Sequence, residues 1–216
     1  MLDQIVSRET SQNEDRRIYG VVIAEVINNL DATNNARVQL RLPWLPGYEP
    51  WARLAVLSGG KERGTYFVPQ VGDEVLVAFN HGDIREPFVI GSLWNQMDPP
   101  PATLQTDPVS KRIIRTPLGH VVEFDDLTQS ITITTTTQQK IVMAPEKIAL
   151  ETTSGTAKVT LDTAGSVTIQ AATGIELKAS SIKLDASANL ELKGGSSVAL
   201  KGGASATIEG AIVKIN

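Results

Sequence analysis

The sequence predicts an all-β protein in which a small closed barrel is followed by a rod of short stacked strands. Two observations carry this prediction. The first half contains apolar stretches separated by turn residues, which is typical of short strands around a barrel core. The second half repeats one small unit, two apolar residues flanking a polar one, about every eight positions. A short fixed period of this kind is typical of a stacked β architecture.

Composition divides the chain into the same two parts. All three Trp, all three Tyr and all four Phe occur by Phe124, and ten of the eleven prolines lie in residues 1–117. This change predicts a domain boundary near residues 118–126. The chain contains no cysteine, so neither disulfides nor thiolate metal sites contribute to it.

Charge and hydropathy argue against nucleic-acid binding and against a secreted or membrane-spanning protein. The net charge is −4, with 9 basic and 12 acidic side chains up to residue 96, and 8 Lys with 7 acids from residue 127 onward. Neither half has the basic excess that nucleic-acid binding needs. The N-terminus lacks the basic start and apolar run of a signal peptide, and no apolar stretch is long enough to cross a membrane as a helix. We therefore expect synthesis in the cytoplasm without a signal peptide.

The front half predicts an arm and a barrel. Residues 1–17 are polar and charged, which indicates a short N-terminal arm. Within residues 18–95 the alternation is clearest at Val38, Leu40 and Leu42, which would share one face of a strand. Five short strands favour a Greek-key barrel of the OB type. The expected strands are Tyr19–Ile27, Ala36–Leu42, Trp51–Leu57, Glu74–Phe79 and Phe88–Leu93.

Residues 96–117 predict a proline-rich linker and a first strand of the second half. The three consecutive prolines of Pro99–Pro101 would hold an extended and fairly stiff connection. Residues 111–124 read as two strands around a Pro-Leu-Gly turn, and Asp125–Asp126 make the next turn. The rod itself is expected over residues 118–216.

The repeat begins with three loosely spaced units and becomes regular from Val159, after which the units start seven or eight residues apart. In each unit the two apolar side chains point one way and the polar side chain the other. Small residues between the units permit sharp corners, and the pairs Gly194–Gly195 and Gly202–Gly203 are interpreted as such corners. The looser units are Ile131–Ile133, Ile141–Met143 and Ile148–Leu150.

Units of eight residues give only one side of a rod per repeat, and no aromatic residue is present to fill a wider interior. Three chains wound together solve this problem, because each layer is then a triangle with one strand from each chain. We therefore predict an intertwined trimeric triangular β-helix, or β-prism, and a homotrimer. The residues expected on the trimer axis are Val159, Leu161, Val167, Ile169, Ile175, Leu177, Ile182, Leu184, Leu190, Leu192, Val198 and Leu200.

Three segments resemble the central spike family of contractile tails, which includes phage baseplate assembly protein V and the VgrG proteins of type VI secretion. The runs Pro69–Phe79 and Pro87–Asn95 are similar to the OB-domain signature of that family. The segment Thr116–Asp126 is similar to the start of its β-helix. The resemblance implies an N-terminal OB domain joined to a trimeric β-prism.

The resemblance also implies a function. The chain would be the central membrane-piercing spike at the baseplate and tube tip of a contractile phage tail or phage-like injection system. It would be assembled into that particle, would contact the target-cell membrane transiently, and would have no enzymatic activity. Because only about 17 residues precede the barrel, we expect the hub on which the OB domain docks to be a separate protein.

The end of the rod predicts a further partner. A last layer at Val213–Ile215 would leave open strand edges and apolar residues facing water, and such surfaces invite pairing. Small phage spikes of this family often end in a metal-binding apex with two histidines, but His81 and His120 lie far upstream, so we expect no metal and no cofactor. We expect a PAAR-type tip protein as the cap. The residues expected to dock it are Ile208, Val213, Ile215 and Asn216.

Four features could carry chemistry but are better explained as structure. His81 and His120 each lie beside a glycine and are interpreted as turn residues. The pair Asp125–Asp126 could serve glycoside hydrolysis, but adjacent residues of a strand point to opposite faces. The threonines of Thr132–Thr137 are expected on an outward strand face. We therefore name no catalytic residue.

Two functions of other classes remain as alternatives. An OB-fold nucleic-acid-binding protein with a fibrous tail would need a basic groove with stacking aromatic residues. A β-helical polysaccharide-degrading enzyme would need clustered carboxylates and aromatic residues on the rod, and there are no aromatic residues after Phe124.

Overall fold

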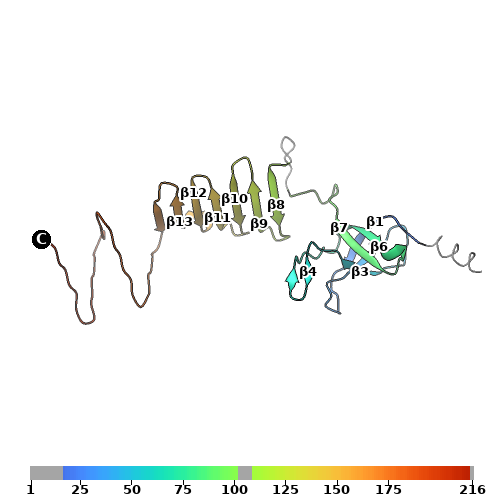
Figure 1. The fold of residues 1–216 in the computed structure, drawn as a ribbon, viewed down its shortest axis with the longest axis horizontal. Helices are drawn as coiled ribbons and strands as arrows, with labels where there is room; N and C mark the ends of the chain where they lie inside the picture. The colour runs from blue at the N-terminus through green and yellow to red at the C-terminus, as the bar shows by residue number, and fades with distance from the viewer. Residues whose placement is uncertain (1–16, 102–108, 215–216) are drawn as a thin grey trace, which may run out of the picture.

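The computed structural model describes residues 17–101 and 109–214. The elements in these ranges are β-strands and two single-turn 3₁₀ segments, Asn80–Gly82 and Thr153–Gly155 (Figure 1). This confirms the all-β fold class. Within the described ranges, no helix is long and apolar enough to cross a membrane. The predicted arm, apart from Arg17, lies outside the described residues, as do Ile215 and Asn216.

Five strands close into the predicted barrel. Their order around the barrel is β1-β2-β3-β7-β6. All neighbouring pairs are antiparallel except β3 and β7, which run parallel and pair Leu54 with Val89. The OB-type barrel is therefore confirmed, with strand ends that differ by a few residues from the expected ones. The strands are β1 (Val22–Asn28), β2 (Val38–Arg41), β3 (Trp51–Leu54), β6 (Glu74–Phe79) and β7 (Pro87–Ser92).

The barrel interior is filled by small and medium aliphatic residues. Val38, Leu40 and Leu42 are all buried in it, as the alternation along that stretch predicted. Strand β6 follows the same rule, since its buried residues alternate with partly exposed ones. A core of this kind stabilises the barrel through the apolar area that it removes from water. The complete core cluster is Ala24, Val26, Val38, Leu40, Leu42, Ala52, Val75, Val77, Phe79 and Val89.

A small hairpin between β3 and β6 is absent from the sequence prediction. It consists of β4 (Gly59–Gly60) and β5 (Arg63–Gly64), each two residues long. The expected strand Trp51–Leu57 is too long for this reason, because the chain leaves the barrel after Leu54 and enters the hairpin. The hairpin lies apart from the barrel wall in Figure 1.

Seven consecutive strands form a second sheet in which each strand pairs antiparallel with its sequence neighbours (Figure 1). The two strands expected around the Pro-Leu-Gly turn are its first members, and the three looser repeat units lie in its middle strands. The strands are β8 (Lys111–Arg115), β9 (Val121–Asp125), β10 (Ser130–Thr134), β11 (Lys140–Ala144), β12 (Lys147–Glu151), β13 (Ala157–Asp162) and β14 (Val167–Ala171).

The strands of the second half differ from the expected three-residue units in two ways. Through Ala171 they are five or six residues long, because the residues flanking each apolar pair also join the hydrogen-bonded ladder. Residues 172–214 form no strand within the described chain and follow an extended zigzag instead (Figure 1). The intertwined β-helix therefore stays a prediction.

Candidate functional site

The long sheet carries two parallel rows of apolar side chains on one face. Directly opposed residues on adjacent strands point to the same side of a sheet, so the strand register defines each row. The first row is Ile114, Val122, Ile133, Ile141, Leu150, Val159 and Ile169. The second row is Phe124, Ile131, Met143, Ile148, Leu161 and Val167.

These two rows form what we call the apolar face, and it is largely open to solvent in one chain. Ten of its thirteen side chains are 40% to 63% exposed. The residues around Ile141 and Leu150 also border a shallow hollow of about 350 Å³. Monomeric soluble proteins rarely expose continuous apolar surface of this extent. The face therefore has the character of an interface.

The opposite face of the same sheet is polar and internally paired. Lys111 bridges Glu123 at 2.6 Å and Asp125 at 3.3 Å, and Lys158 bridges Glu151 at 2.6 Å. The hydrogen bond that Lys111 donates to Glu123 raises the pKa of Lys111, and the hydrogen bond that Glu151 accepts from Lys158 lowers the pKa of Glu151. These charges already have partners, and the apolar residues of this face do not form a continuous row.

The predicted axis residues lie on or beyond the apolar face. Val159, Leu161, Val167 and Ile169 belong to its two rows. The remaining eight lie in residues 172–214, where the described chain has no strand. Eleven of the twelve are 41% to 68% exposed, and Val159 is half-buried. One chain alone therefore gives these side chains little shelter from water.

The extended segment 173–214 has its polar backbone groups open to solvent. No backbone–backbone hydrogen bond joins two of its described residues. Its ion pairs are local, Lys178–Glu176 at 2.7 Å and Lys183–Asp185 at 3.1 Å. Peptide groups that are later buried must find hydrogen-bond partners, so any burial of this segment requires strands from elsewhere.

The glycine pairs lie at bends, as predicted. A Cβ atom at Gly194 would collide with the carbonyl oxygen of Ser197, and a Cβ atom at Gly202 would collide with that of Ser205. The second glycine of each pair, Gly195 or Gly203, has no neighbouring atom in the way. The first glycine of each corner is therefore the one that the geometry requires.

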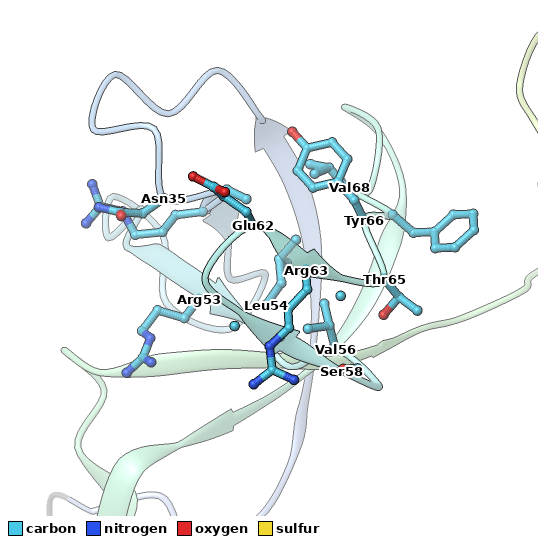
Figure 2. A pocket seen from close by; sticks show the side chains of 16 residues that line it. Asn35, Arg53, Leu54, Val56, Ser58, Glu62, Arg63, Thr65, Tyr66 and Val68 are labelled. Atoms are coloured by element: carbon cyan, nitrogen blue, oxygen red, sulfur yellow. The ribbon is translucent and has the colours of Figure 1, made fainter.

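The barrel has a pocket of about 820 Å³, which we call the barrel pocket (Figure 2). Three segments enclose it: residues 35–37 before β2, the end of β3, and the connection 56–68 that contains the β4–β5 hairpin. Figure 2 shows the guanidinium groups of Arg53 and Arg63 on one side and the ring of Tyr66 on the other. Tyr66 and Phe67 are 79% and 68% exposed.

A single carboxylate organises the loop that forms one wall of this pocket. The Asp31 carboxylate accepts hydrogen bonds from six donors, which belong to Thr33, Asn35 and Arg37. The hydrogen bonds from the Arg37 guanidinium are the main cause that holds the pKa of Asp31 well below its usual range. The same hydrogen bonds raise the pKa of Arg37. The network holds Ala36 in a left-handed conformation, with φ of +52°. The wall is therefore preorganised.

The hairpin that forms the other wall depends on glycine. Gly64 has φ of +137°, and a Cβ atom there would collide with the carbonyl oxygen of Ser58. Glu62 at the tip is also left-handed, with φ of +55°. Only glycine fits the position of Gly64 without displacing the backbone.

Two arginines of the barrel pocket have no acidic partner. Arg37 is paired with Asp31 at 3.0 Å and also lies 5.7 Å from the centre of the Trp51 ring. Arg53 lies 5.3 Å from the centre of the Phe88 ring. In residues 17–101 and 109–214, neither Arg53 nor Arg63 forms an ion pair with a carboxylate. The pocket therefore combines exposed aromatic rings with two cations that can accept an anionic partner.

The sequence does not predict this pocket. Its residues come from three separated segments, and the hairpin lacks the apolar alternation that identifies a strand. The signal that was available is the pair Gly59–Gly60 followed by Gly64, which brackets a tight turn. The exposed pair Tyr66–Phe67 directly after that turn was a second signal.

The structure agrees with the sequence on the two histidines and the aspartate pair, and only in part on the threonine run. His81 lies in the 3₁₀ turn between β6 and β7, with φ of +47°. His120 follows the turn between β8 and β9. Asp125 and Asp126 face different cations, Lys111 and Arg112, and so do not form a shared acidic site. Thr132 and Thr134 lie on the polar face of β10, whereas Thr135–Thr137 lie beyond the end of the strand, in the connection to β11. No cluster of three potential metal ligands occurs in the part of the chain that the structure describes.

Residues 22–94 match the family model described as the type VI secretion system/phage-baseplate injector OB domain. These residues comprise almost the whole barrel and its hairpin. The match agrees with the closed five-stranded order of the structure. It confirms the resemblance based on Pro69–Phe79 and Pro87–Asn95.

Several curated proteins are also similar. Actin cross-linking toxin VgrG1 of Vibrio cholerae is 27% identical over 121 residues, which is 51% of this chain and 11% of that protein. Type VI secretion system spike protein VgrG3 of Vibrio cholerae is 29% identical over 111 residues, which is 46% of this chain and 11% of that protein. Spike protein VgrG5 of Pseudomonas aeruginosa is 47% identical over 45 residues, which is 21% of this chain and 6% of that protein. The alignments cover about a tenth or less of each relative.

Proposed function

We propose that this chain is a mechanical spike. The premise is that the chain belongs to the VgrG-like baseplate spike family, with residues 22–94 as its injector OB domain. In this proposal it forms a homotrimer in a contractile phage tail or phage-like injection particle. The OB domain docks on a hub protein, and the second half forms a β-prism that transmits force to the target envelope. No catalytic activity is assigned to it.

The observation that carries the proposal is the apolar face together with the segment that continues it. Thirteen apolar side chains in two rows, ten of them exposed, lie on one side of the β8–β14 sheet, while the other side is mostly polar and carries ion pairs. The repeat then continues through residues 172–214 with no partner strand in the described chain. Both features are accounted for if copies of the chain share one axis, since apolar burial and strand pairing are then achieved together.

The name of VgrG1 includes an actin cross-linking activity, which is a property of that protein. The similarity covers 11% of its length and therefore gives no reason to assign the activity here. The description of VgrG3 as a spike protein agrees better with a chain whose second half is an extended strand system. This comparison supports a structural function.

The hub and the tip partner are the finer parts of the proposal. Ile208 and Val213 are 70% and 52% exposed, so they are available to a PAAR-type tip protein. Ile215 and Asn216, the other two expected docking residues, lie outside the described residues. The complete proposal has the barrel on the hub, the axis residues in the centre, and the tip protein at the far end, where the particle meets the target membrane.

The test is the mass of the purified full chain in solution by size-exclusion chromatography with light scattering. We expect a particle of three chains, each of 23.2 kDa. A stable species with the mass of one chain would overturn the proposal. Small-angle scattering on the same sample should give an elongated particle, and a compact trimer would contradict the β-prism.

A further inference from the structure

We propose that the barrel pocket of one copy binds the proline-rich segment Asp98–Pro101 of a neighbouring copy. The inference rests on the proposed function, because it needs more than one chain in the particle. It adds a specific contact between subunits at the level of the barrels, separate from the apolar face. Four observations lead to it.

The first observation is that the pocket and the linker begin at the same end of the barrel. Strands β3 and β7 are parallel neighbours, with Arg53 opposite Phe88 and Leu54 opposite Val89. The chain leaves β3 to form the hairpin wall of the pocket, and it leaves β7 to form the linker. In a ring of copies that share an axis, the linker of one copy and the pocket of its neighbour can therefore lie close together.

The second observation is chemical complementarity. Consecutive prolines adopt an extended polyproline helix, and such segments dock in grooves that are lined by aromatic rings. The pocket offers Tyr66 and Phe67 for this contact. Asp98 precedes the prolines and supplies a carboxylate for Arg63 or Arg53. Arginine and carboxylate form charge-assisted hydrogen bonds of good geometry.

The third observation is that the linker of the same chain does not fill the pocket. All residues that line the pocket lie between Asn35 and Val68. Immediately after β7 the chain turns, because the Asn95 side chain accepts hydrogen bonds from the backbone N–H groups of Met97 and Asp98. The N–H of Asn95 in turn donates to the carbonyl of Asp98 at 3.1 Å. This turn leaves Pro99, Pro100 and Pro101 exposed.

The fourth observation is that the pocket is built before a ligand arrives. The Asp31 network fixes one wall, and the obligate glycine Gly64 fixes the other. A preorganised pocket loses little conformational entropy on binding, and a polyproline segment also loses little. A single-stranded nucleic acid fits less well, because the two free arginines offer few phosphate contacts in an acidic chain.

The chain has no cysteine, so any disulfide formed after two cysteines are introduced must join the introduced residues. The test variant carries Tyr66→Cys and Pro100→Cys in the full chain. A disulfide requires Cα atoms within about 7 Å, so bond formation under mild oxidation marks close approach. We expect linked species of two and three chains on a non-reducing denaturing gel. The matched control carries His81→Cys and Pro100→Cys, since His81 is exposed in the β6–β7 turn. We expect no linked species from it.

Light scattering of each sample separates the possible failures. A trimer without linked chains, or with a bond only inside one chain, overturns the docking inference and leaves the proposed function standing. A monomer overturns both. Equal linkage in test and control variants reports random collision and also overturns the inference.

A charge exchange provides a second measurement. In the Tyr66→Cys and Pro100→Cys background, Arg63→Glu should reduce the linked fraction several-fold, and Asp98→Arg should do the same. The two changes together should restore most of the linkage. A linked fraction that does not change in any of these variants would exclude the ion pair as a part of the contact.

Discussion

Val159 of β13 lies directly opposite Ile169 of β14, so two successive units of the repeat place their apolar residues in one row. The row extends across all seven strands of the sheet, from Ile114 to Ile169. The repeat therefore brings apolar residues that are far apart in sequence into one continuous surface. The first prediction concerns that surface.

Ile169→Glu should prevent assembly of the trimer, whereas Thr168→Glu should not. The two residues are neighbours in β14 but point to opposite faces, and both are exposed in one chain. A carboxylate at position 169 would be buried against the other copies without a partner, at a cost of several kcal/mol per chain. Light scattering of both variants measures the difference. Equal masses for the two variants would show that the apolar face is not the interface.

Amide hydrogens of residues 173–214 should exchange slowly in the trimer and within seconds once the trimer dissociates. The described chain gives these residues no backbone partner of their own, so their protection must come from other copies. Residues 121–151 form the central strands of a self-paired sheet and should keep partial protection after dissociation. Hydrogen exchange read by mass spectrometry resolves the two regions. Rapid exchange over 173–214 in an intact trimer would argue against an intertwined rod.

Gly202→Ala should lower the melting temperature of the trimer, and Gly203→Ala should have a much smaller effect. A Cβ atom at Gly202 collides with the Ser205 carbonyl, whereas a Cβ atom at Gly203 meets nothing. The strain at Gly202 should cost about 1–3 kcal/mol per chain. Gly194→Ala and Gly195→Ala repeat the comparison one corner earlier. Differential scanning calorimetry gives the values, and the reverse order at either corner would contradict the structure.

Asp31→Asn should destabilise the barrel and reduce its sensitivity to acid. The pKa of Asp31 is lowered in the folded state, mainly by Arg37, so the folded barrel binds this proton less readily than the unfolded chain. The resulting stability is complete above the unfolded pKa of about 3.9 and is lost as the pH falls below it. Thermal melts between pH 6 and pH 3 measure the slope, at roughly half-unit steps. Glu49→Gln is a suitable control, because Glu49 is exposed and lies outside this network. An equal acid slope in wild type and Asp31→Asn would show that this carboxylate does not stabilise the loop.

Most of the barrel could be predicted because its strands alternate. Val38, Leu40 and Leu42 alternate with arginine and glutamine, and Glu74–Phe79 lies between the turn residues Gly72–Asp73 and Asn80. The hairpin at Gly59–Gly60 could not be predicted in this way, because two-residue strands made largely of glycine show no alternation of apolar and polar residues. The barrel pocket could not be predicted from alternation either. Whether Arg53 has an acidic partner depends on how segments distant in sequence pack together.

In the second half, one pattern has two outcomes. The unit Val167–Ile169 becomes part of a strand because β13 lies beside it. The similar unit Ile175–Leu177 does not, although its apolar spacing is the same. Local sequence specifies which residues share a face, but pairing needs a neighbouring strand, and the pattern does not say which chain supplies it. The trimer axis is for this reason still a prediction.

The order of strands in the β8–β14 sheet has a kinetic consequence. Every strand pairs only with the strand before it and the strand after it, so all its contacts are short in sequence. Sheets with such local contacts form quickly. Each polypeptide can therefore complete this sheet soon after it leaves the ribosome, whereas in the proposed trimer the segment beyond Ala171 would pair only after assembly. While β8 to β14 are being made, the nascent chain therefore displays little unpaired strand, which protects this part from joining the wrong neighbours during synthesis.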